Sequence, residues 1–337
     1  MQTRTVTFTA PGVAELIKSE ISAPKQNEVQ VKLTVSSVSS GTERANLMAD
    51  PNCGINAAAS AAFPKTLGYS SSGVITAIGS GVEEFEIGDR VAMSWSIHSE
   101  YININANNVY KLPDNISFED GAIFHISIFP MAAIRKCRLE MGESAIVMGM
   151  GVLGLVSIPL LRQAGAVPII AVDPDPKKRE KALAVGADYA LDPYAPDFAE
   201  TAKKLTNGGA KVGIEVTGIG AGLDGILDCM ARFGRVALLG CTRNKDFTID
   251  YYRKVHGPGI TLIGAHTAAR PSFESCGGWW TERDDMKSII KLTEMGRVKL
   301  SDLIDETYSP DDAPEVFHRL ATEKTFPLVQ FDWRKLK

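Results

Sequence analysis

Cysteine and clustered positive charge are both scarce in this sequence. The five cysteines are odd in number, widely spaced and without a C-x-x-C pair, so they encode neither a disulfide framework nor a cysteine zinc cluster. Lys and Arg total 36 against 40 for Asp and Glu, which gives a net charge of −4, and no basic run is long enough to neutralise a row of phosphates. We therefore expect no nucleic-acid partner.

Long apolar runs are absent as well. A membrane helix needs about 18 apolar residues in a row, and the best candidate, residues 145–161, is interrupted by three glycines, a serine and a proline. Residues 1–6 alternate polar and apolar side chains like a strand, and they lack the apolar stretch and cleavage site of a signal peptide. These absences predict no membrane partner and a cytoplasmic location.

The remaining composition is that of an ordinary globular protein. Hydrophobic residues make up 45% and charged residues 23%, with 30 glycines and 17 prolines, a balance that excludes disordered and collagen-like chains. At 337 residues, the chain is about twice as long as one hydrophobic core usually supports, so two domains are expected.

The first part of the chain, up to about residue 120, has the pattern of a β domain. Short runs alternate apolar and polar side chains and are separated by turn residues, which favours an all-β barrel or sandwich. The expected strands are residues 28–35, 73–79 and 88–92.

From about residue 144 the periodicity changes. Apolar runs of four to six residues alternate with amphipathic stretches, which predicts parallel strands joined by crossover helices. The expected strands are 145–148, 167–172, 212–216, 235–239 and 260–263, and the expected helices include 176–185, 221–231, 284–295 and 311–321.

The strongest local signal is a glycine-rich turn, Gly149-Met150-Gly151-Val152-Leu153-Gly154, which follows the first of these strands and opens a helix. In a dinucleotide-binding turn the first glycine permits the tight bend, the second lets the backbone approach a pyrophosphate, and the third lets helix and strand pack closely. The helix N-terminus then offers free N–H groups to the phosphates. The sequence therefore predicts a dinucleotide site here.

An acidic residue lies where such a site needs one. The next strand ends in Asp173, 24 residues after Gly149 (173 − 149), close to the spacing of about 20 expected for the carboxylate that binds the ribose diol. A carboxylate there repels a 2′-phosphate, so we expect NAD as the cofactor. The alternatives are a plain structural turn with Asp173 capping the next helix, and attraction of a 2′-phosphate by the nearby Lys177, Lys178 and Arg179.

Several further fragments occur in a specific order around the glycine turn. They are Ser40-Gly41-Thr42-Glu43, Leu67-Gly68-Tyr69, Ser72-Gly73-Val74-Ile75, Gly88-Asp89-Arg90-Val91, Ser99-Glu100-Tyr101 and Lys111-Leu112-Pro113. In this order, and over nearly the whole length, the chain resembles the medium-chain dehydrogenase/reductase superfamily, which includes alcohol, sorbitol and threonine dehydrogenases.

The resemblance implies an α/β fold with two parts. A GroES-like β-barrel catalytic domain would comprise residues 1–122 and the returning segment 266–337, and a Rossmann domain with a doubly wound parallel sheet would comprise residues 123–265. It also implies an active site in the cleft between them, and a homodimer or homotetramer in which strands around residues 258–265 pair between subunits. The expected cofactor residues are Gly149, Gly151, Val152, Leu153, Gly154, Asp173, Thr217, Leu239, Gly240 and Ala265.

The family's catalytic zinc site is altered in this chain. Zinc-using members take ligands from a Cys in C-G-[ST]-D, a His in G-H-E, and a Cys, Asp or Glu about two dozen residues before the glycine turn. The matching positions here are Ser40, Tyr69 and His125. Only His125 commonly binds zinc, whereas a catalytic zinc needs three protein ligands. We therefore expect a zinc-free member with no metal site.

Without zinc, protein groups must activate the substrate oxygen. The resemblance places Tyr69 and His125 at the vacated metal position, and Thr42 matches the hydroxyl that relays the substrate proton. Our hypothesis is that His125, or alternatively Tyr69, is the general base while Thr42 positions the substrate hydroxyl. A free histidine has a pKa of about 6.5 and a tyrosine of about 10, which favours His125. A purely structural role is the alternative for each residue.

Residues after the last strand are candidates for substrate contact. In relatives the backbone there lies beside the nicotinamide carboxamide, so His266 is within reach of substrate, and Trp279 and Trp280 are candidate walls of a polar pocket. Their alternatives are an interface or surface histidine and an aromatic pair that seals one domain to the other. Three histidines remain. We expect His98 and His256 to be secondary candidates for the site and His318 to face the solvent.

Three functions are open at this point. The first is a zinc-independent, NAD-dependent oxidoreductase acting on a secondary alcohol such as a sugar, polyol, cyclitol or sugar acid. The second is a zinc-free quinone or enoyl reductase, which usually uses NADPH, and Asp173 argues against it. The third is a non-catalytic nucleotide-binding protein, since a binding site can survive the loss of chemistry.

Overall fold

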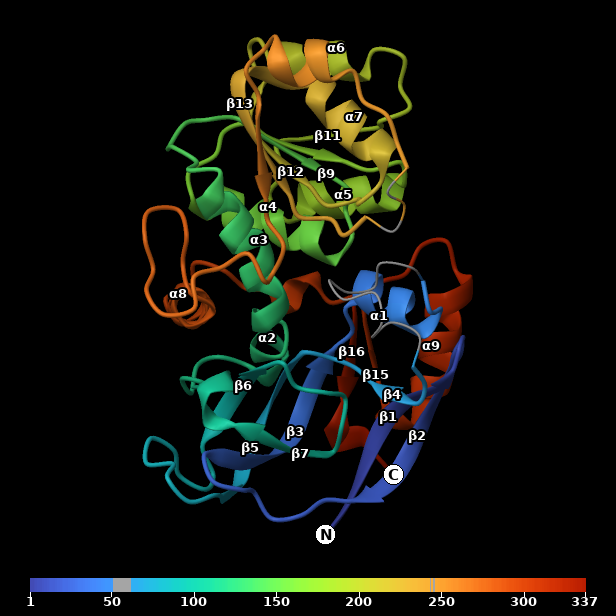
Figure 1. Cartoon of the computed structure of the whole chain (residues 1–337), viewed down its shortest axis with the longest axis vertical. Coiled ribbons are helices and arrows are strands. Elements are labelled where there is room, and N and C mark those ends of the chain that lie inside the picture. Colours follow the sequence, from blue (N-terminus) through green and yellow to red (C-terminus); the bar gives the residue numbers. More distant parts are fainter. Residues whose placement is uncertain (51–61, 243, 245) are drawn as a thin grey trace. The chain divides into compact units, whose positions relative to one another are not determined.

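The computed structural model describes residues 1–50, 62–242, 244 and 246–337. Cys53 lies outside the described residues, and the other four cysteines are free thiols. The chain divides into two units (Figure 1), Met1–Ile126 together with Met286–Lys337, and Ser127–Asp285. In this division the second unit extends to Asp285, whose carboxylate pairs with Arg135 and Arg270 of the same unit. The expected domains, 1–122 with 266–337 and 123–265, stay a prediction.

The first unit is built on two sheets. A seven-stranded sheet has the order β15-β16-β3-β5-β6-β8, with β7 also paired to β3, and a three-stranded sheet has the order β2-β1-β4. Its strands are β1 Gln2–Ala10, β2 Val13–Glu20, β3 Glu28–Ser37, β4 Lys65–Thr66, β5 Ser70–Ile78, β6 Arg90–Ser94, β7 Tyr101–Asn105, β8 Val109–Lys111, β15 Glu306–Tyr308 and β16 Val329–Asp332. The three strands expected from the sequence in this region correspond to β3, β5 and β6.

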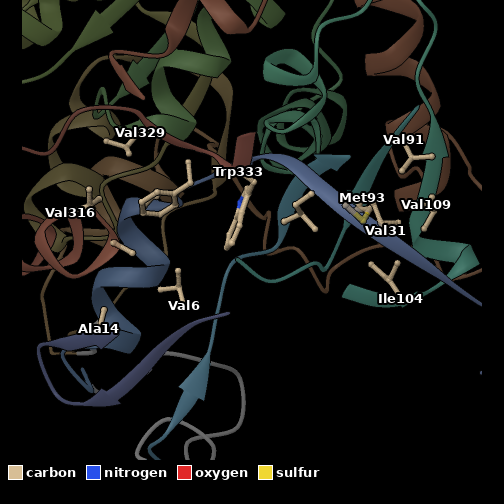
Figure 2. Packing of buried hydrophobic residues seen from close by; sticks show 14 of the residues in the cluster. Val6, Ala14, Val31, Val91, Met93, Ile104, Val109, Val316, Val329 and Trp333 are labelled. Carbon is tan, nitrogen blue, oxygen red and sulfur yellow. The ribbon is translucent and has the colours of Figure 1, made fainter. Parts of the chain in front are cut away.

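Short helices complete the first unit. They are α1 Ser40–Leu47, α2 Phe118–Gly121 and α9 Ala313–Thr322, with short 3₁₀ turns at Ala106–Asn108, Ser301–Leu303, Pro310–Asp312 and Trp333–Lys335. The expected helix 311–321 is α9 preceded by one of these turns. Residues from both ends of the chain share one hydrophobic core (Figure 2), in which Val6 and Val31 from the N-terminal part join Val316, Val329 and Trp333 from the C-terminal part.

The second unit contains one parallel sheet of six strands. Its order is β11-β10-β9-β12-β13-β14, and every neighbouring pair is parallel. The chain moves outward from β9 through β10 to β11 and then crosses back to β12 on the other side of β9, so the carboxyl ends of β9 and β12 form the switch point where such sheets bind ligands. The strands are β9 Ala145–Met148, β10 Ile169–Val172, β11 Tyr189–Leu191, β12 Ala210–Glu215, β13 Met230–Leu238 and β14 Thr261–Gly264.

The helices of the second unit connect these strands (Figure 1). They are α4 Val152–Gln163, α5 Pro176–Ala184, α6 Phe198–Leu205, α7 Gly220–Asp228 and a π-helical turn Tyr252–His256, while α3 Phe124–Lys136 and α8 Glu282–Glu294 each cross a boundary between the units. One expected helix, 221–231, was wrong at its end: α7 stops at Asp228, because Met230 already pairs with Ala210 in the sheet. The fold is the expected α/β combination of a GroES-like domain and a Rossmann-type parallel sheet.

Candidate active site and nucleotide site

The glycine turn between β9 and α4 has the geometry of a dinucleotide-binding loop. Gly149 adopts φ +102°, a conformation that favours glycine. A Cβ on Gly154 would lie 1.8 Å from the Gly149 carbonyl oxygen, so only glycine allows this close packing. A Cβ on Gly151 would meet no described protein atom within 4 Å. The space beside Gly151 is therefore open at the point where a pyrophosphate is expected, and Val152 begins the helix whose N-terminus faces it.

The Asp173 side chain is hydrogen-bonded to this loop. Its buried carboxylate accepts a hydrogen bond from the Met150 N–H at 2.8 Å and another from the Asp175 N–H at 2.9 Å. One acid thus joins the glycine turn to the start of α5. A carboxylate has about four lone-pair sites, so these two bonds leave capacity for the two hydroxyls of a ribose.

The basic residues at the start of α5 differ in their contacts. Arg179 donates through one guanidinium nitrogen to the carbonyls of Asp173 at 2.7 Å and Pro174 at 2.9 Å, and it pairs with Asp192 at 3.3 Å. Lys177 is exposed and Lys178 is partly exposed on the same helix. The guanidinium of Arg179 therefore stabilises the β10–α5 loop through these hydrogen bonds.

The other expected cofactor residues gather at the carboxyl ends of β12 and β13. The buried carboxylate of Glu215 accepts hydrogen bonds from the Thr217 N–H at 2.7 Å and from the Thr217 hydroxyl. The Glu215 carbonyl accepts from the N–H groups of Leu239 and Gly240 at 2.9 and 2.8 Å. Ala265 is buried at the end of β14, and Leu153 lies in the first turn of α4.

The sequence analysis did not single out Glu215, although it organises this loop. Burial raises the pKa of its carboxyl group, while the hydrogen bonds from Thr217 and Gly218 act in the opposite direction. An acid at the end of an apolar strand next to a Thr-Gly pair was the available signal.

In the first unit, Tyr69, Trp95 and His125 form an aromatic group. The ring centroids of Trp95 and His125 are 4.7 Å apart and those of Tyr69 and His125 are 5.6 Å apart. The Tyr69 carbonyl accepts hydrogen bonds from the His125 Nδ1 at 2.6 Å and from the Trp95 N–H at 2.9 Å. A carbonyl can only accept, so Nδ1 carries a proton and the neutral ring has its lone pair on Nε2.

Trp95 was missed by sequence reasoning. It follows β6 with φ +59°, which is uncommon for a large side chain, and it is 49% exposed. Strained backbone of this kind is often found at functional sites. No motif marks it, because a tryptophan at a strand end is more often part of a core.

The hydroxyl that meets Tyr69 belongs to Ser39. The Tyr69 hydroxyl and the Ser39 hydroxyl are hydrogen-bonded, whereas Ser40 is the first residue of α1 and Thr42 lies in its first turn. The contact with Tyr69 therefore comes from the residue before α1, and Ser40 and Thr42 follow it in the first turn of the helix.

These residues do not form a zinc-binding set. Hydroxyl groups stand at two of the three positions where zinc relatives carry ligands, and they are not usual zinc ligands. Across residues 1–50, 62–242, 244 and 246–337, no group of three or more His, Cys, Asp or Glu side chains is placed to hold a metal ion. The chemistry of the donor set at Ser40, Tyr69 and His125 does not fit a catalytic zinc.

The expected substrate residues of the second unit contact cations of α3. The Trp279 ring lies 4.7 Å from the Lys136 ammonium and the Trp280 ring 3.6 Å from the Arg135 guanidinium. His266 is exposed, and its Nδ1 accepts a hydrogen bond from the Ala268 N–H at 3.1 Å. Burial, and secondarily the charge of Lys136, lower the pKa of His266.

The three remaining histidines differ in environment. His98 is 1% exposed and contacts Glu43. His256 stacks on Tyr251 and meets Tyr252 edge to face, and His318 is exposed on α9. The helices of the described residues include none that is long and apolar enough to cross a membrane.

Two family models match the chain. Residues 25–114 match the alcohol dehydrogenase GroES-like domain, and residues 152–278 match the zinc-binding dehydrogenase domain. The second match begins after Ser40, Tyr69 and His125, so it carries no statement about the metal position.

The chain is also similar in sequence to known dehydrogenases. The chain is 34% identical to (R,R)-butanediol dehydrogenase of Bacillus subtilis in an alignment of 184 positions that covers 46% of this chain and 53% of that enzyme. It is 27% identical to D-guloside 3-dehydrogenase of Shigella flexneri in an alignment of 335 positions that covers 92% of this chain and 93% of the relative.

Solved structures share the fold. The butanediol dehydrogenase of Bacillus subtilis superposes with a TM-score of 0.82 at 23% identity, covering 98% of this chain and 99% of that one. At the same TM-score the fold occurs in a dehydrogenase from Sinorhizobium meliloti 1021 bound to NADP and in one from Escherichia coli CFT073 complexed with NADH.

A GroES-like unit and a parallel-sheet unit with a dinucleotide loop define a nucleotide-dependent dehydrogenase. The chain belongs to the medium-chain alcohol dehydrogenase superfamily. It is a dehydrogenase of that family acting on alcohols, and a nicotinamide nucleotide, NAD or NADP, is the typical cofactor.

Proposed function

We propose that this protein is a zinc-independent, NAD-dependent dehydrogenase of a secondary alcohol belonging to a sugar, polyol, cyclitol or sugar acid. The observation that carries the proposal is the hydrogen bond of 2.6 Å from His125 Nδ1 to the Tyr69 carbonyl. It leaves Nε2 as the basic atom of the neutral ring, in a group where zinc relatives have a metal ligand.

The nucleotide is held by residues of the second unit. The open side of Gly151 and the N-terminus of α4 suit a pyrophosphate, and Asp173 suits the ribose diol. Bound nicotinamide supplies a hydride acceptor. NAD is favoured over NADP because Asp173 is anionic and Arg179 is engaged with backbone carbonyls and Asp192.

His125 takes the proton of the reaction. When the alcohol is oxidised, the carbinol C–H leaves as hydride and the O–H proton passes to Nε2 of His125, so that the substrate becomes a ketone. Thr42 positions the substrate hydroxyl. The Tyr69 hydroxyl is the alternative proton acceptor, and its bond to Ser39 supplies a hydrogen-bonding partner for that role.

Aromatic side chains favour a carbohydrate-like substrate. The exposed part of Trp95 offers an amphipathic ring surface beside Tyr69 and His125. D-Guloside 3-dehydrogenase and sorbitol dehydrogenase of Bacillus subtilis are among the relatives. His266, Trp279 and Trp280 are proposed as further substrate contacts.

The protein is proposed to be a cytoplasmic homodimer or homotetramer that binds neither nucleic acid nor membranes. The strand β14 pairs with β13 on one side and is the last strand in the order of its sheet. A second copy can add to that edge. Light scattering after size exclusion tests this; a monomer at micromolar concentration would contradict it.

The test of the function is a panel of polyols, cyclitols and sugar acids with NAD or NADP, monitored by NADH absorbance with and without a chelator. Turnover that needs NAD and survives chelation supports the proposal. Stoichiometric zinc in the purified protein, together with activity lost on chelation, contradicts zinc independence. Reduction of quinones or enoyl compounds with NADPH identifies the reductase alternative, and nucleotide binding without turnover identifies the non-catalytic one.

A further inference from the structure

The proposed mechanism leaves unused a buried acid and a buried histidine in the first unit. Glu43 lies in α1 and is 0% exposed, and His98, which lies between β6 and β7, is 1% exposed. The His98 Nε2 is 3.1 Å from the Glu43 Oε2. Ionisable groups are rarely buried to this extent without a specific arrangement of partners.

The partners of this pair fix the direction of the hydrogen bond between His98 and Glu43. An ionised carboxylate can only accept, so the His98 Nε2 carries a proton and donates it to Glu43. At the other end the Trp333 indole N–H, which can only donate, bonds the Ser36 hydroxyl at 2.9 Å, and that hydroxyl is 2.7 Å from the His98 Nδ1. Ser36 donates to Nδ1 when the ring is neutral and accepts from it when the ring is charged, so both forms keep the bond to Glu43.

Glu43 also fixes the position of Ser39 through two hydrogen bonds. Its second oxygen, Oε1, accepts a hydrogen bond from the Ser39 N–H at 2.7 Å, while the Glu43 N–H donates to the Ser39 carbonyl at 2.9 Å. Ser39 precedes the first turn of α1, yet its hydroxyl makes no cap to the helix. That hydroxyl is bonded to the Tyr69 hydroxyl, so Glu43 replaces the capping role and frees Ser39 for Tyr69.

Tyr69 is thereby held at both ends. Its hydroxyl is bonded to Ser39, and its carbonyl accepts from His125 and from the Trp95 N–H. A displacement of Ser39 would rotate the Tyr69 ring against His125, whose ring centroid is 5.6 Å away. A displacement of about 1 Å in a catalytic group can lower the rate of an enzyme about 10²-fold.

We propose that the buried Glu43–His98 pair is a positioning element that fixes Ser39 and, through it, the Tyr69 hydroxyl beside the His125 base. The proposal rests on the proposed function for its effect on turnover, but its structural link from Glu43 to Tyr69 does not. Glu43 and His98 are positioning residues, since they act through Ser39 and Tyr69.

The variants follow from the direction of the hydrogen bonds. Glu43→Gln leaves one acceptor oxygen for two N–H groups, so its NH₂ group faces the N–H of either His98 or Ser39 and sets donor against donor. His98→Leu removes the bonds to both Ser36 and Glu43, whereas His98→Gln retains one acceptor and one donor. Thr5→Val is the matched control, because it deletes another buried hydrogen bond close to His98, 2.7 Å from the Thr5 hydroxyl to that of Ser99, and leaves the side-chain bonds of Glu43 and His98 in place.

In the kinetic arm, Glu43→Gln and His98→Leu should lower kcat at least tenfold with the Kd for NADH within twofold of wild type. His98→Gln should recover most of the rate, and Thr5→Val should retain it. Folded Glu43→Gln or His98→Leu protein with wild-type kcat would overturn the proposal, as would loss of rate in Thr5→Val equal to that of the other two.

A spectroscopic arm works without substrate. With ¹⁵N-labelled histidine, His98 of the wild-type protein should show a proton on Nε2, and a neutral ring with its proton on Nδ1 would overturn the proposal. The ¹³Cζ resonance of Tyr69, assigned with Tyr69→Phe, should move in Glu43→Gln and stay in Thr5→Val. If it stays in both, the link fails. A wild-type enzyme inactive on the whole panel but showing these signals refutes the proposed function alone.

Discussion

His125 acts as a base only if Nε2 is the atom that faces the substrate. The sequence supplied the residue, but its tautomer comes from the hydrogen bond to the Tyr69 carbonyl. We predict that His125→Ala lowers kcat by about 10²-fold, the usual contribution of a general base, with little change in NADH affinity. His318→Ala, the same substitution at an exposed site on α9, is the control. An unchanged steady-state rate for His125→Ala would remove His125 as the base.

Lys136 makes the free energy of unfolding depend on pH in the alkaline range. Burial lowers its pKa from 10.5 to about 8, Arg270 adds to the shift and Asp285 opposes it. Between these two pKa values the unfolded chain binds more protons than the folded one, so the free energy of unfolding rises as the pH increases from about 8 to about 10.5. Below pH 8 the cost of the buried charge is present in full, up to about 3 kcal/mol.

Replacing Lys136 by Met should therefore remove this rise. We expect the difference in unfolding free energy between Lys136→Met and wild type to favour the variant most near pH 7 and to shrink toward pH 10.5, as measured by urea denaturation at several pH values. The exposed Lys324→Met should show a difference that does not vary over this range. A pH-independent difference for Lys136→Met would contradict the assignment.

At the scale of elements, two glycines of the β9–α4 turn have different roles, one in ligand binding and one in packing. Gly151 has φ −76° and ψ −168°, which alanine can adopt, and open space beside it, whereas Gly154 packs against the Gly149 carbonyl. We predict that Gly151→Ala leaves the unfolding free energy within about 0.5 kcal/mol of wild type but raises the Kd for NADH about tenfold or more. Gly154→Ala should impair both. Fluorescence titration and thermal unfolding measure the two effects, and unchanged affinity in Gly151→Ala would place the pyrophosphate elsewhere.

Asp285 ties the end of α3 to the segment that follows β14. Its carboxylate, 0% exposed, bonds Arg135 and Arg270, both at 2.9 Å. Removing the charge leaves two partly buried guanidinium groups uncompensated, so Asp285→Asn should lower the unfolding free energy by about 3 kcal/mol. Asp302→Asn, which removes an exposed pair with Lys299, should leave the unfolding free energy nearly unchanged, because water and salt screen exposed pairs. Equal effects in urea denaturation would contradict the buried bridge.

Hydrophobic periodicity was sufficient to locate most strands and helices. The strand 145–148 coincides with β9, and the helix 176–185 ends one residue beyond α5, whose start is capped by Asp175. The Ser39–Tyr69 and Glu43–His98 contacts could not be predicted in this way. Their partners are 30 and 55 residues apart, and they meet only because β3, β5 and β6 pair in one sheet.

At the scale of the whole molecule, nucleotide binding should be visible as stability. A ligand that binds only the folded state raises the unfolding free energy by about 2.7 kcal/mol at 100 times its Kd. We predict this gain for NADH and a smaller gain for NADPH at the same concentration, measured by thermal unfolding, while dialysis against EDTA leaves the melting temperature unchanged. A fall in melting temperature after EDTA would reveal a structural metal.

The sheet order of the first unit has a consequence for biosynthesis. Its strand β3 pairs with β16 from the far end of the chain, and β15 extends the sheet beyond β16. A ribosome therefore completes the whole second unit before it has made the last partners of the first. Translation halted before Val329 would leave one edge of β3 without its partner, so the first unit can complete its sheet only after β16 has left the ribosome.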